Sequence, residues 1–421
     1  MNHNPFNIGC IPKSIRFQEL CYGFITGVLA MLFLPGAAQP QSLAGQLTEH
    51  GFENVTVMKT GAHLFVAYEN RIYRSEAEAL ANVLTFAGRA EVSADSLTVI
   101  IRQSEVPVLA VITSISSLDG FLNGGKRYEA WLDATEITLH TRSLPFARAD
   151  GHRTVRHRTR FRPVFPVGLG MRYQLGNYNE PYRFAFDLEP EIALPLGRGF
   201  TANARLAVPL YNNFDDNTYI RPALATLSRH FTLDEGLHGA VSAGIFGRNR
   251  AGVHSAIKAF LYQEIFSLTL DAGYTRFTSF TGEVNFPITE NRPYSFYTLS
   301  ADYRWRSYDL NIRAQYGRFL YDDFGTRVQV HRHFSEVEFG FFGINTRLGS
   351  NFGFYMSLPL SPRKYRDAGP VRIRPAPRFP IAYRYQGNDF RARTYETGIR
   401  FEEQLMQVYP SFIKNELKRF F

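Results

Sequence analysis

The sequence predicts a mainly β protein in which a small N-terminal α/β domain precedes an antiparallel transmembrane β-barrel of about 12–14 strands and a C-terminal amphipathic helix. Three observations predict this fold: an apolar run near the N-terminus, strand-type alternation through the second half, and a change of net charge between the halves. We place a signal peptide at residues 1–38, a periplasmic α/β domain at 39–150, the barrel at 151–401 and the helical segment at 402–421.

A basic and then apolar segment near the start predicts export. Lys13 and Arg16 precede an apolar run over residues 22–34, and small residues follow up to Ala38. This order is typical of a secretory signal peptide, with cleavage near Ala38. The alternative is a membrane anchor, but the run is shorter than the roughly 18 residues that a spanning helix needs.

Net charge separates the two halves of the chain. Residues 39–150 carry 9 Lys and Arg against 13 Asp and Glu, and residues 151–421 carry 36 against 24. This change indicates a boundary near Asp150. The basic half holds 32 Arg and only 4 Lys. Guanidinium groups bind carboxylates or phosphates in pairs of hydrogen bonds and also stack on aromatic rings, and we favour the structural use because aromatic residues are plentiful.

Cysteine usage and hydropathy narrow the function classes. The 2 cysteines, Cys10 and Cys21, lie in or before the apolar run, so we expect the mature chain to have no disulfide, thiolate metal site or cysteine nucleophile. No other segment reaches about 18 apolar residues, so a membrane crossing by the mature chain would need a closed barrel. We expect no cofactor, and an exported chain is not expected to bind nucleic acid.

Two helices are expected in the first domain. A short apolar pattern around Leu43 and Leu47 predicts the first. Ser75, followed three residues later by Glu78, forms a capping box and predicts the start of the second. Its apolar stripe consists of Ala77, Leu80, Ala81 and Leu84, and Gly88 predicts its end.

Four strands are expected around these helices. Apolar alternation predicts two of them at 55–57 and 64–68, and β-branched runs predict two more at 97–102 and 108–115. Pro107 is expected to separate the last two, because proline cannot donate within a central ladder.

One polar segment of this domain is a candidate binding surface. It could grip a polymer or a partner, and the alternative is a strand end with a solvated Glu–Arg pair. Its candidate residues are Tyr68, Glu69, Asn70, Arg71 and Arg74.

Period-two alternation dominates the second half. From Arg183 to Leu196 every even position is apolar, and odd positions carry charged residues that include Asp187 and Glu189. One face therefore meets lipid or a core, and the other meets water. The same pattern recurs at 200–210, 268–274, 297–305, 308–316, 352–360 and 395–401. Weaker candidates at 163–175, 220–231, 238–248, 254–265, 325–335, 337–347 and 380–386 bring the expected strands to fourteen.

The lengths of strands and connections favour a membrane barrel over the alternative, a large secreted β-sandwich. Many segments have the length of a tilted membrane crossing. Short connections at 197–199, Ser267, Arg306 and Glu336 alternate with longer ones at 176–181, 211–219, 279–293 and 318–324. An even number of strands would place both ends in the periplasm. The Pro/Arg-rich stretch 361–379 does not fit, and we interpret it as a lumen insertion or a sign of a different strand count.

After Phe401 the pattern becomes helical. The apolar residues suggest an amphipathic helix interrupted at Pro410, which could plug the barrel mouth, lie on the inner face or act as a simple packing helix. They are Leu405, Met406, Val408, Phe412, Ile413, Leu417 and Phe421.

Several motifs resemble one family. The segments 317–334, 338–342 and 351–362 look like the closing hairpins of the YjbH-like (GfcD-like) outer-membrane proteins of exopolysaccharide and capsule biosynthesis. The segments 51–55 and 68–74 resemble the domain that precedes a barrel in that family. Family members often carry a lipoprotein signal and a second barrel. Neither is expected here, so the resemblance implies a single-barrel variant.

The resemblance implies a non-enzymatic outer-membrane protein that helps an exopolysaccharide cross, or mature at, the outer membrane. Its partners would be outer-membrane lipid, the polysaccharide and other proteins of a secretion system. Charged luminal groups could hydrogen-bond the polymer weakly enough for passage, or could instead fill the lumen with ion pairs. The candidates are Arg183, Asp187, Glu189, Arg205, Asp302, Arg304, Asp309 and Arg313.

Two other function classes stay open at this point. A polysaccharide hydrolase is one, because Asp187, Glu189 and Glu191 share a strand face at roughly 6.5–7 Å intervals, which overlaps the carboxylate spacings of glycosidases. A general porin is the other. His331 and His333 also share a strand face, but two ligands without a third make a poor metal site, so we expect no metal.

Overall fold

The computed structural model describes residues 42–421 except 91, 142–143, 145–158, 177, 180, 214–217, 263, 279–292, 367–371, 386–389 and 399–400, and except the side chains of 402–404. The signal-peptide prediction therefore lies outside the described residues, as does most of the expected loop 279–293. Among the described residues, no helix has the length and hydropathy needed to span a membrane.

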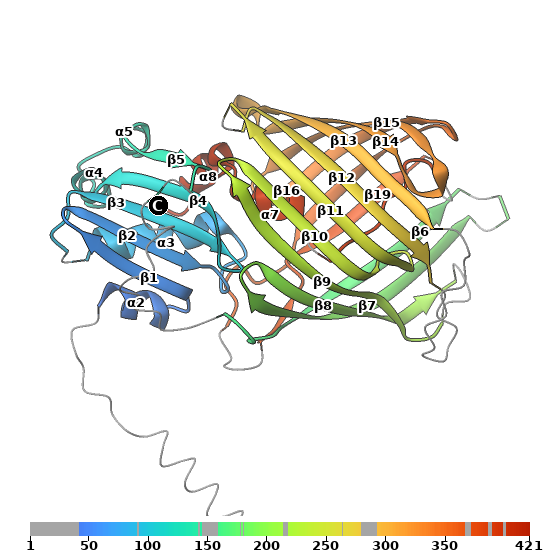
Figure 1. Ribbon diagram of the computed structural model, residues 1–421, viewed down its shortest axis with the longest axis horizontal. Coiled ribbons are helices and arrows are strands. Elements are labelled where there is room, and N and C mark those ends of the chain that lie inside the picture. Colours follow the sequence, from blue (N-terminus) through green and yellow to red (C-terminus); the bar gives the residue numbers. More distant parts are fainter. Residues whose placement is uncertain are drawn as a thin grey trace, which may run out of the picture. The chain divides into compact units, whose positions relative to one another are not determined.

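Two sheets organise the described chain (Figure 1). The first, called here the small sheet, has the order β1-β2-β3-β4-β5. Only β2 and β3 are parallel, because helix α3 connects them. The strands are β1 Glu53–Thr60, β2 His63–Glu69, β3 Ser96–Gln103, β4 Val106–Ser114 and β5 Glu136–Thr138. The helices are α2 Leu43–Glu49, α3 Glu76–Gly88, α4 Ile115–Leu122 and α5 Tyr128–Asp133.

Two details of the small sheet differ from expectation. Ser75 is the N-cap of α3, but its side chain makes no capping hydrogen bond, so the predicted capping box does not form. Pro107 lies inside β4 rather than between strands, opposite Arg102 at a register shift. The irregular register at this position removes the need for a ladder N–H, which explains why proline is tolerated. The reversal between β3 and β4 uses Ser104 and Glu105, both with positive φ.

The C-terminal helices complete the core of the small sheet. Helix α7 spans Phe401–Met406, and α8 spans Pro410–Leu417 with its proline at the first turn, where no N–H is needed. The predicted break at Pro410 is therefore confirmed. These helices pack with α3 and with the face of the small sheet that carries Val66 and Val99. Their buried apolar residues are Phe401, Leu405, Val408, Tyr409, Phe412, Ile413 and Leu417.

The second sheet, called here the large sheet, contains fourteen strands among the described residues. All neighbours are antiparallel except β18 and β6. The strands are β6 Val164–Leu175, β7 Tyr182–Gly197, β8 Phe200–Asn212, β9 Arg221–Asp234, β10 Leu237–Phe246, β11 Arg250–Leu261, β12 Phe266–Phe277, β13 Tyr294–Trp305, β14 Leu310–Arg318, β15 Phe324–Phe334, β16 Val337–Thr346, β17 Gly349–Pro359, β18 Arg372–Pro375 and β19 Arg378–Arg384.

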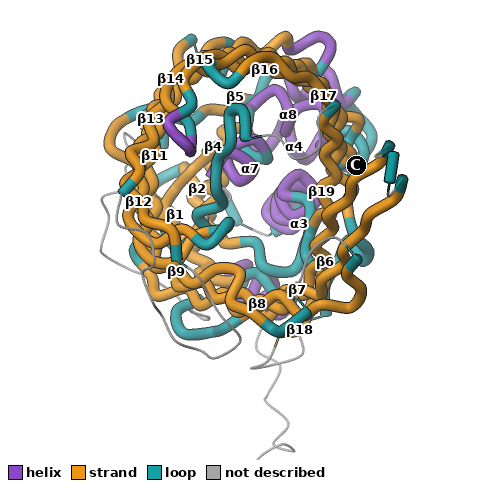
Figure 2. The backbone as a smooth tube through the Cα atoms, turned by 90° about the vertical axis from the view of Figure 1, so that its right-hand side faces the viewer, coloured by secondary structure: helices purple, strands orange, loops and turns teal. Residues whose placement is uncertain are grey.

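The two end strands of the large sheet are consecutive pieces of one extended segment. Only Ala376 and Pro377 separate β18, which pairs with β6, from β19, which pairs with β17. The ladder is not closed between β18 and β19. Nevertheless, β6 and β19 lie side by side, because Tyr173 and Tyr383 stack at 6.5 Å between ring centroids. Figure 2 shows the strands curving around an interior.

This arrangement corrects the strand assignment at the C-terminal end. Residues 395–401 were expected to form a strand, but 395–398 are irregular and Phe401 begins α7. The extended segment 372–384 includes instead part of the proline-rich stretch that did not fit the pattern. Pro375 and Pro377 are tolerated because they flank the point where the segment changes its partner strand. The turn expected at Ser267 also lies earlier, between β11 and β12.

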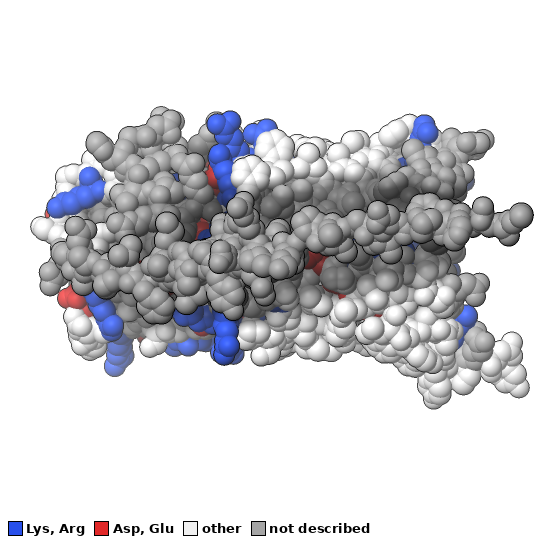
Figure 3. Space-filling model, turned by 90° about the horizontal axis from the view of Figure 1, so that it is seen from below, with Lys and Arg blue, Asp and Glu red and all other residues white. Residues whose placement is uncertain are grey.

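The faces of the large sheet alternate as the sequence predicted. On β13, Phe296, Thr298, Ser300, Asp302 and Arg304 are buried on the inner face. Their neighbours Tyr297, Leu299, Tyr303 and Trp305 are exposed on the outer face. In Figure 3 the visible outer surface of the large sheet is mostly uncharged, with Lys and Arg side chains gathered toward its ends. The polar face therefore points inward, and the apolar face is the exposed one.

Candidate functional site: the interior of the large sheet

The strands of the large sheet end in two different settings. The turns that follow β7, β9, β11, β13 and β15 lie at the end that faces the small sheet, called here the junction end. Gly199, in the first of these turns, donates its N–H to the Ser104 carbonyl at 2.8 Å. The opposite end, called here the loop end, carries the turns after β10, β14 and β16. The C-terminal segment runs between these two ends.

Residues 390–398 run through the interior from the loop end toward the junction end. Near the loop end, the Ala392 N–H donates to Asp323 at 2.7 Å, and the Gly247 N–H donates to the Glu396 carbonyl at 2.9 Å. Deeper inside, Tyr395 contacts His254 with 3.0 Å between the hydroxyl and Nδ1. Asn203 then donates to the Gly398 carbonyl at 3.3 Å. This segment therefore lies inside the curved sheet, against β8, β11 and the turns after β10 and β14.

An arginine on β8 binds this segment. Arg205 lies 3.0 Å from Glu191, 3.2 Å from Glu189 and 3.0 Å from Glu396. Glu189 and Glu191 share a face of β7, and the register places Arg205 opposite Glu191. Two of the carboxylates considered for hydrolysis therefore bind the same guanidinium. Asp187, the third, binds Arg221 at 2.8 Å.

A second charge cluster is centred on Asp302. This carboxylate is 4% exposed and lies 2.6 Å from Arg313 and 3.2 Å from Lys258, whose side chain is fully buried. Ser267 and Asn311 donate to it at 3.3 Å each. A buried carboxylate with this many donors is held in its ionised form by its partners.

The third cluster joins the large sheet to helix α8. Arg304 is paired with Asp309 and donates to Ser411 at 3.3 Å. Asp309 also accepts from Asn415 at 3.1 Å. Arg304 further lies 5.7 Å from the ring centroid of Tyr409, within cation–π range. Helix α8 therefore contacts the junction end of β13 and the turn that follows it.

The eight predicted lumen residues all lie on strand faces or turns that border the interior, and Arg183 of this set donates to the Asn213 carbonyl at 3.5 Å. Sequence reasoning proposed two roles for them, polymer contact or ion pairing. Ion pairs are present at the other seven residues. Contact with a polymer stays a prediction. Three residues that form ion pairs with this set were not predicted from the sequence. They are Arg221, Lys258 and Glu396.

The prediction of an exposed gripping surface at 68–74 is wrong for its first residues. Tyr68 and Glu69 are 0% and 2% exposed. Glu69 accepts from Asn54 at 2.5 Å, from the Ser104 N–H at 2.7 Å and from Arg71 at 2.6 Å. The carboxylate of Glu69 is therefore bound by neighbouring residues of the same chain, and this part of the segment is buried.

The end of the same segment binds the large sheet. Arg74 makes two hydrogen bonds to Glu336, at 2.8 and 2.6 Å, in the turn between β15 and β16. The Arg74 N–H donates to the Arg363 carbonyl at 2.8 Å. On the other side, Glu53 of β1 binds Arg162 at 2.8 Å and Arg372 of β18. The small sheet therefore binds the large sheet of the same chain through ion pairs of both Arg74 and Glu53.

Asn70 shapes the turn of this segment and supports a buried acid. Its side-chain oxygen accepts from the Tyr73 N–H at 2.9 Å, and its amide donates to Glu76 at 3.2 Å. Tyr68 donates to the same carboxyl at 2.9 Å. Burial raises the pKa of Glu76 to about 7, although the hydrogen bonds from Tyr68 and Asn70 favour the ionised form.

The raised pKa of Glu76 predicts a loss of stability as pH increases. Between about pH 4.5 and 7 the folded chain keeps a proton that the unfolded chain releases, so the free energy of unfolding falls as pH rises through this window. The loss amounts to about 3 kcal/mol, and Glu76→Gln is expected to abolish it. Urea unfolding at pH 5 and pH 8 measures it, with Trp131 as the reporter in a Trp305→Phe background. A slope that is equal in wild type and Glu76→Gln would contradict the prediction.

A histidine pair on β15 gains a third neighbour in the structure. His331, His333 and Glu338 each offer one ligand atom, and these atoms lie within 4.8 Å of one another. Both histidines are buried. Glu338 was not among the residues predicted from the sequence, although the tight turn at Ser335 and Glu336 places it directly opposite His333 on β16.

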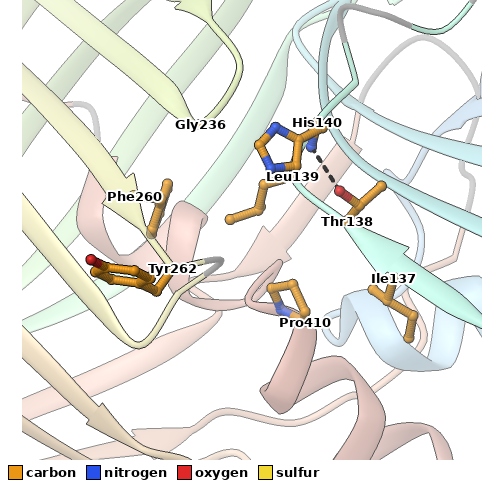
Figure 4. Close-up of a pocket in the computed structure, with 8 residues that line it drawn as sticks. All are labelled: Ile137, Thr138, Leu139, His140, Gly236, Phe260, Tyr262 and Pro410. Carbon is orange, nitrogen blue, oxygen red and sulfur yellow. Dashed lines mark hydrogen bonds between the residues drawn. The ribbon is translucent and has the colours of Figure 1, made fainter. Parts of the chain in front are cut away.

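A small cavity lies where β5, the turns after β9 and β11, and α8 meet (Figure 4). Its volume of about 90 Å³ holds a few water molecules and is too small for a sugar chain. Its lining is Ile137, Thr138, Leu139, His140, Gly236, Phe260, Tyr262 and Pro410. The cavity is therefore a packing gap at the junction rather than a substrate site.

Comparison with known proteins identifies the family. The family model described as exopolysaccharide biosynthesis protein YbjH matches residues 34–226 and 223–367, which is most of the chain. The chain belongs to this YjbH family of exopolysaccharide biosynthesis proteins. The resemblance of its hairpin motifs is thereby confirmed. Among curated proteins, no sequence matches the chain. The matched residues include the small sheet and β6 to β17, so the family relationship covers both sheets.

Proposed function

We propose that the large sheet is a closed β-barrel in the bacterial outer membrane, and that the protein assists secretion or assembly of an exopolysaccharide there. The observation that supports this most is the inside-out alternation of the large sheet. Its polar and charged residues are buried, and its exposed face is apolar. A surface of this size and hydropathy favours contact with lipid.

Aromatic residues at both ends of the strands support the membrane placement. Exposed aromatic residues near the loop end are Tyr182, Tyr211, Tyr274, Tyr297, Tyr316 and Phe352. Exposed aromatic residues near the junction end are Phe200, Tyr262, Phe266, Trp305, Tyr308 and Phe334. Aliphatic residues such as Leu270 and Leu299 lie between them. From Tyr297 to Trp305 a strand rises about 27 Å, or about 20 Å at the usual tilt, which suits the apolar band of an outer membrane.

Closure of the barrel is assigned to the extended segment 372–384. Its first part, β18, pairs with β6, and its second part, β19, pairs with β17. Between them, the Ala376 N–H donates to the Val167 carbonyl at 2.9 Å. Strands β6 to β17 then supply twelve crossings and this segment a thirteenth. An odd number makes the closing pair parallel, as β18 and β6 are. It also leaves the chain at the loop end, from which residues 390–398 return through the lumen.

The small sheet lies in the periplasm in this arrangement. Export by the predicted signal peptide delivers the chain to that side, and the short turns of the junction end suit periplasmic turns. In this proposal the C-terminal segment obstructs the lumen, so the protein acts as an assisting component and not as a standing open pore. Polymer would meet the periplasmic face, and the other proteins of a secretion system would be its partners.

A deletion strain tests the proposed function. We expect loss of the chain to reduce secreted exopolysaccharide several-fold without reducing its cytoplasmic precursors, and expression of the wild-type chain to restore it. Total secreted sugar and membrane fractionation are the measurements. An unchanged yield of every secreted polymer would refute the role, and recovery of the mature chain in the periplasmic soluble fraction would refute the barrel.

A further inference from the structure

We propose that His331, His333 and Glu338 form a binding site for one divalent transition-metal ion, with Zn²⁺ as the ion that suits their chemistry best. Two imidazole nitrogens and one carboxylate oxygen are a common ligand set for zinc, which binds such donors at about 2.0–2.2 Å. The three donor atoms here lie within 4.8 Å of one another, so small side-chain rotations bring them onto one ion.

The hairpin of β15 and β16 places the three side chains on one face. His331 and His333 are two residues apart and therefore point to the same side, toward the interior. His333 pairs with Glu338 across the ladder, and His331 pairs with Gly340. A Cβ at Gly340 would lie 2.7 Å from the His331 Cβ and 2.8 Å from the Tyr355 ring, so glycine at this position lets these two side chains approach β16 closely.

His333 supplies the second observation that points to a ligand. The residue is 4% exposed, and neither of its ring nitrogens has a hydrogen-bond partner. A buried imidazole without partners is costly, since it gives up its hydrogen bonds to water. Coordination of an ion satisfies one nitrogen directly. The ring of Phe412 from α8 stands edge-on to His333 at 5.6 Å and shields it from solvent.

Neighbouring residues orient the Glu338 carboxylate, and they could keep these contacts when an ion is bound. Tyr355 donates to its Oε1 at 3.1 Å, and Arg378 lies 3.7 Å from its Oε2. Groups of this kind orient metal ligands in known sites. The charge of Arg378 disfavours hard cations that depend on carboxylates alone. The same charge weakens Zn²⁺ binding less, because zinc gains most of its affinity from imidazole. We therefore favour zinc over calcium or magnesium.

The chain offers an internal control for this site. His230 and His238 are also buried and stack at 6.1 Å on the neighbouring strands β9 and β10. They do not belong to a group of three ligands among the described residues. A pair of histidines alone is therefore expected to bind zinc weakly.

Metal titration of the full mature chain tests the proposal. The protein is purified in detergent with a tag that contains no histidine, stripped with chelator, and titrated with Zn²⁺ by calorimetry and with Co²⁺ by visible absorption. We expect one ion per chain and a Co²⁺ spectrum of a four-coordinate nitrogen and oxygen site. His333→Ala and Glu338→Gln should each raise the Kd about 100-fold or more, whereas His238→Ala should leave it unchanged.

The outcomes separate the site from surface binding. Absence of saturable binding, or equal affinity in wild type and His333→Ala, overturns the proposal. Equal loss of affinity in His238→Ala also overturns it, because the effect is then not local. If His333→Ala fails to fold by circular dichroism, Glu338→Gln decides, since it keeps the shape of the side chain and removes only the charge.

Discussion

Replacing Asp302 with alanine is expected to lower the free energy of unfolding by about 3–5 kcal/mol. The substitution leaves the fully buried Lys258 and the half-buried Arg313 without their shared counter-charge. This is costly above all for Lys258, because a buried ammonium group cannot recover the hydration that it gave up on folding. Thermal or guanidinium unfolding in detergent, followed by loss of the β-sheet circular dichroism signal, measures the change.

An exposed ion pair of the large sheet provides the matched control. Arg318 and Asp322 are paired near the loop end, and the Asp322 side chain is 58% exposed. Asp322→Ala should change stability by less than about 1 kcal/mol, because water replaces the lost contact. If Asp302→Ala were no more destabilising than Asp322→Ala, the interior would have to be hydrated enough to solvate charges. The proposed filled lumen would then be wrong.

The sequence was sufficient to predict most strands, because alternation is a local signal. The pattern at 297–305 survives as the buried Asp302 and the exposed Trp305 of β13. It failed at 395–401, where residues 395–398 lie in the interior without a ladder and Phe401 begins α7. Alternation indicates that the two faces of an extended segment lie in different environments. It does not indicate whether the segment pairs with neighbouring strands.

The missed strand β18 shows the opposite limit. It consists of four residues of a proline-rich stretch, and its ladder partner is β6, some two hundred residues earlier in the chain. Pairing of this kind is decided by the closure of the sheet and leaves no periodic signal in four residues. Among the described residues the large sheet has fourteen strands, the number expected from the sequence, but β18 takes the place of the strand expected at 395–401.

The candidate site was predictable residue by residue but not as pairs. The sequence selected Asp187, Glu189 and Arg205 because of their strand face. It did not identify Glu396 as a partner of Arg205, because that contact depends on the path of the C-terminal segment. These pairs also bear on the hydrolase alternative. A glycosidase needs one carboxyl that is free to donate a proton, whereas Glu189 and Glu191 share Arg205 and Asp187 binds Arg221.

The C-terminal segment is expected to keep the lumen closed, and a reversible cross-link tests this. A Cβ built at Gly247 lies 3.2 Å from the Glu396 Cβ, close to the separation in a disulfide, so Gly247→Cys with Glu396→Cys should cross-link on mild oxidation. The mature chain is expected to have no competing cysteine. Gly247→Cys with Lys418→Cys is the control pair. It should not cross-link, because Lys418 follows α8 and pairs with Glu129 beside the small sheet.

Conductance measurements test whether residues 390–398 block ion flow through the lumen. Replacing residues 390–398 with Gly and Ser keeps α7 and α8 in the core of the small sheet but removes the lumen contacts of Tyr395 and Glu396. This variant should form channels in planar bilayers, whereas wild type should show little conductance and the oxidised cross-linked chain none. A wild-type channel as conductive as the linker variant would favour the porin reading. A linker variant that stays closed would mean that other luminal groups, such as the Asp302 cluster, seal the interior by themselves.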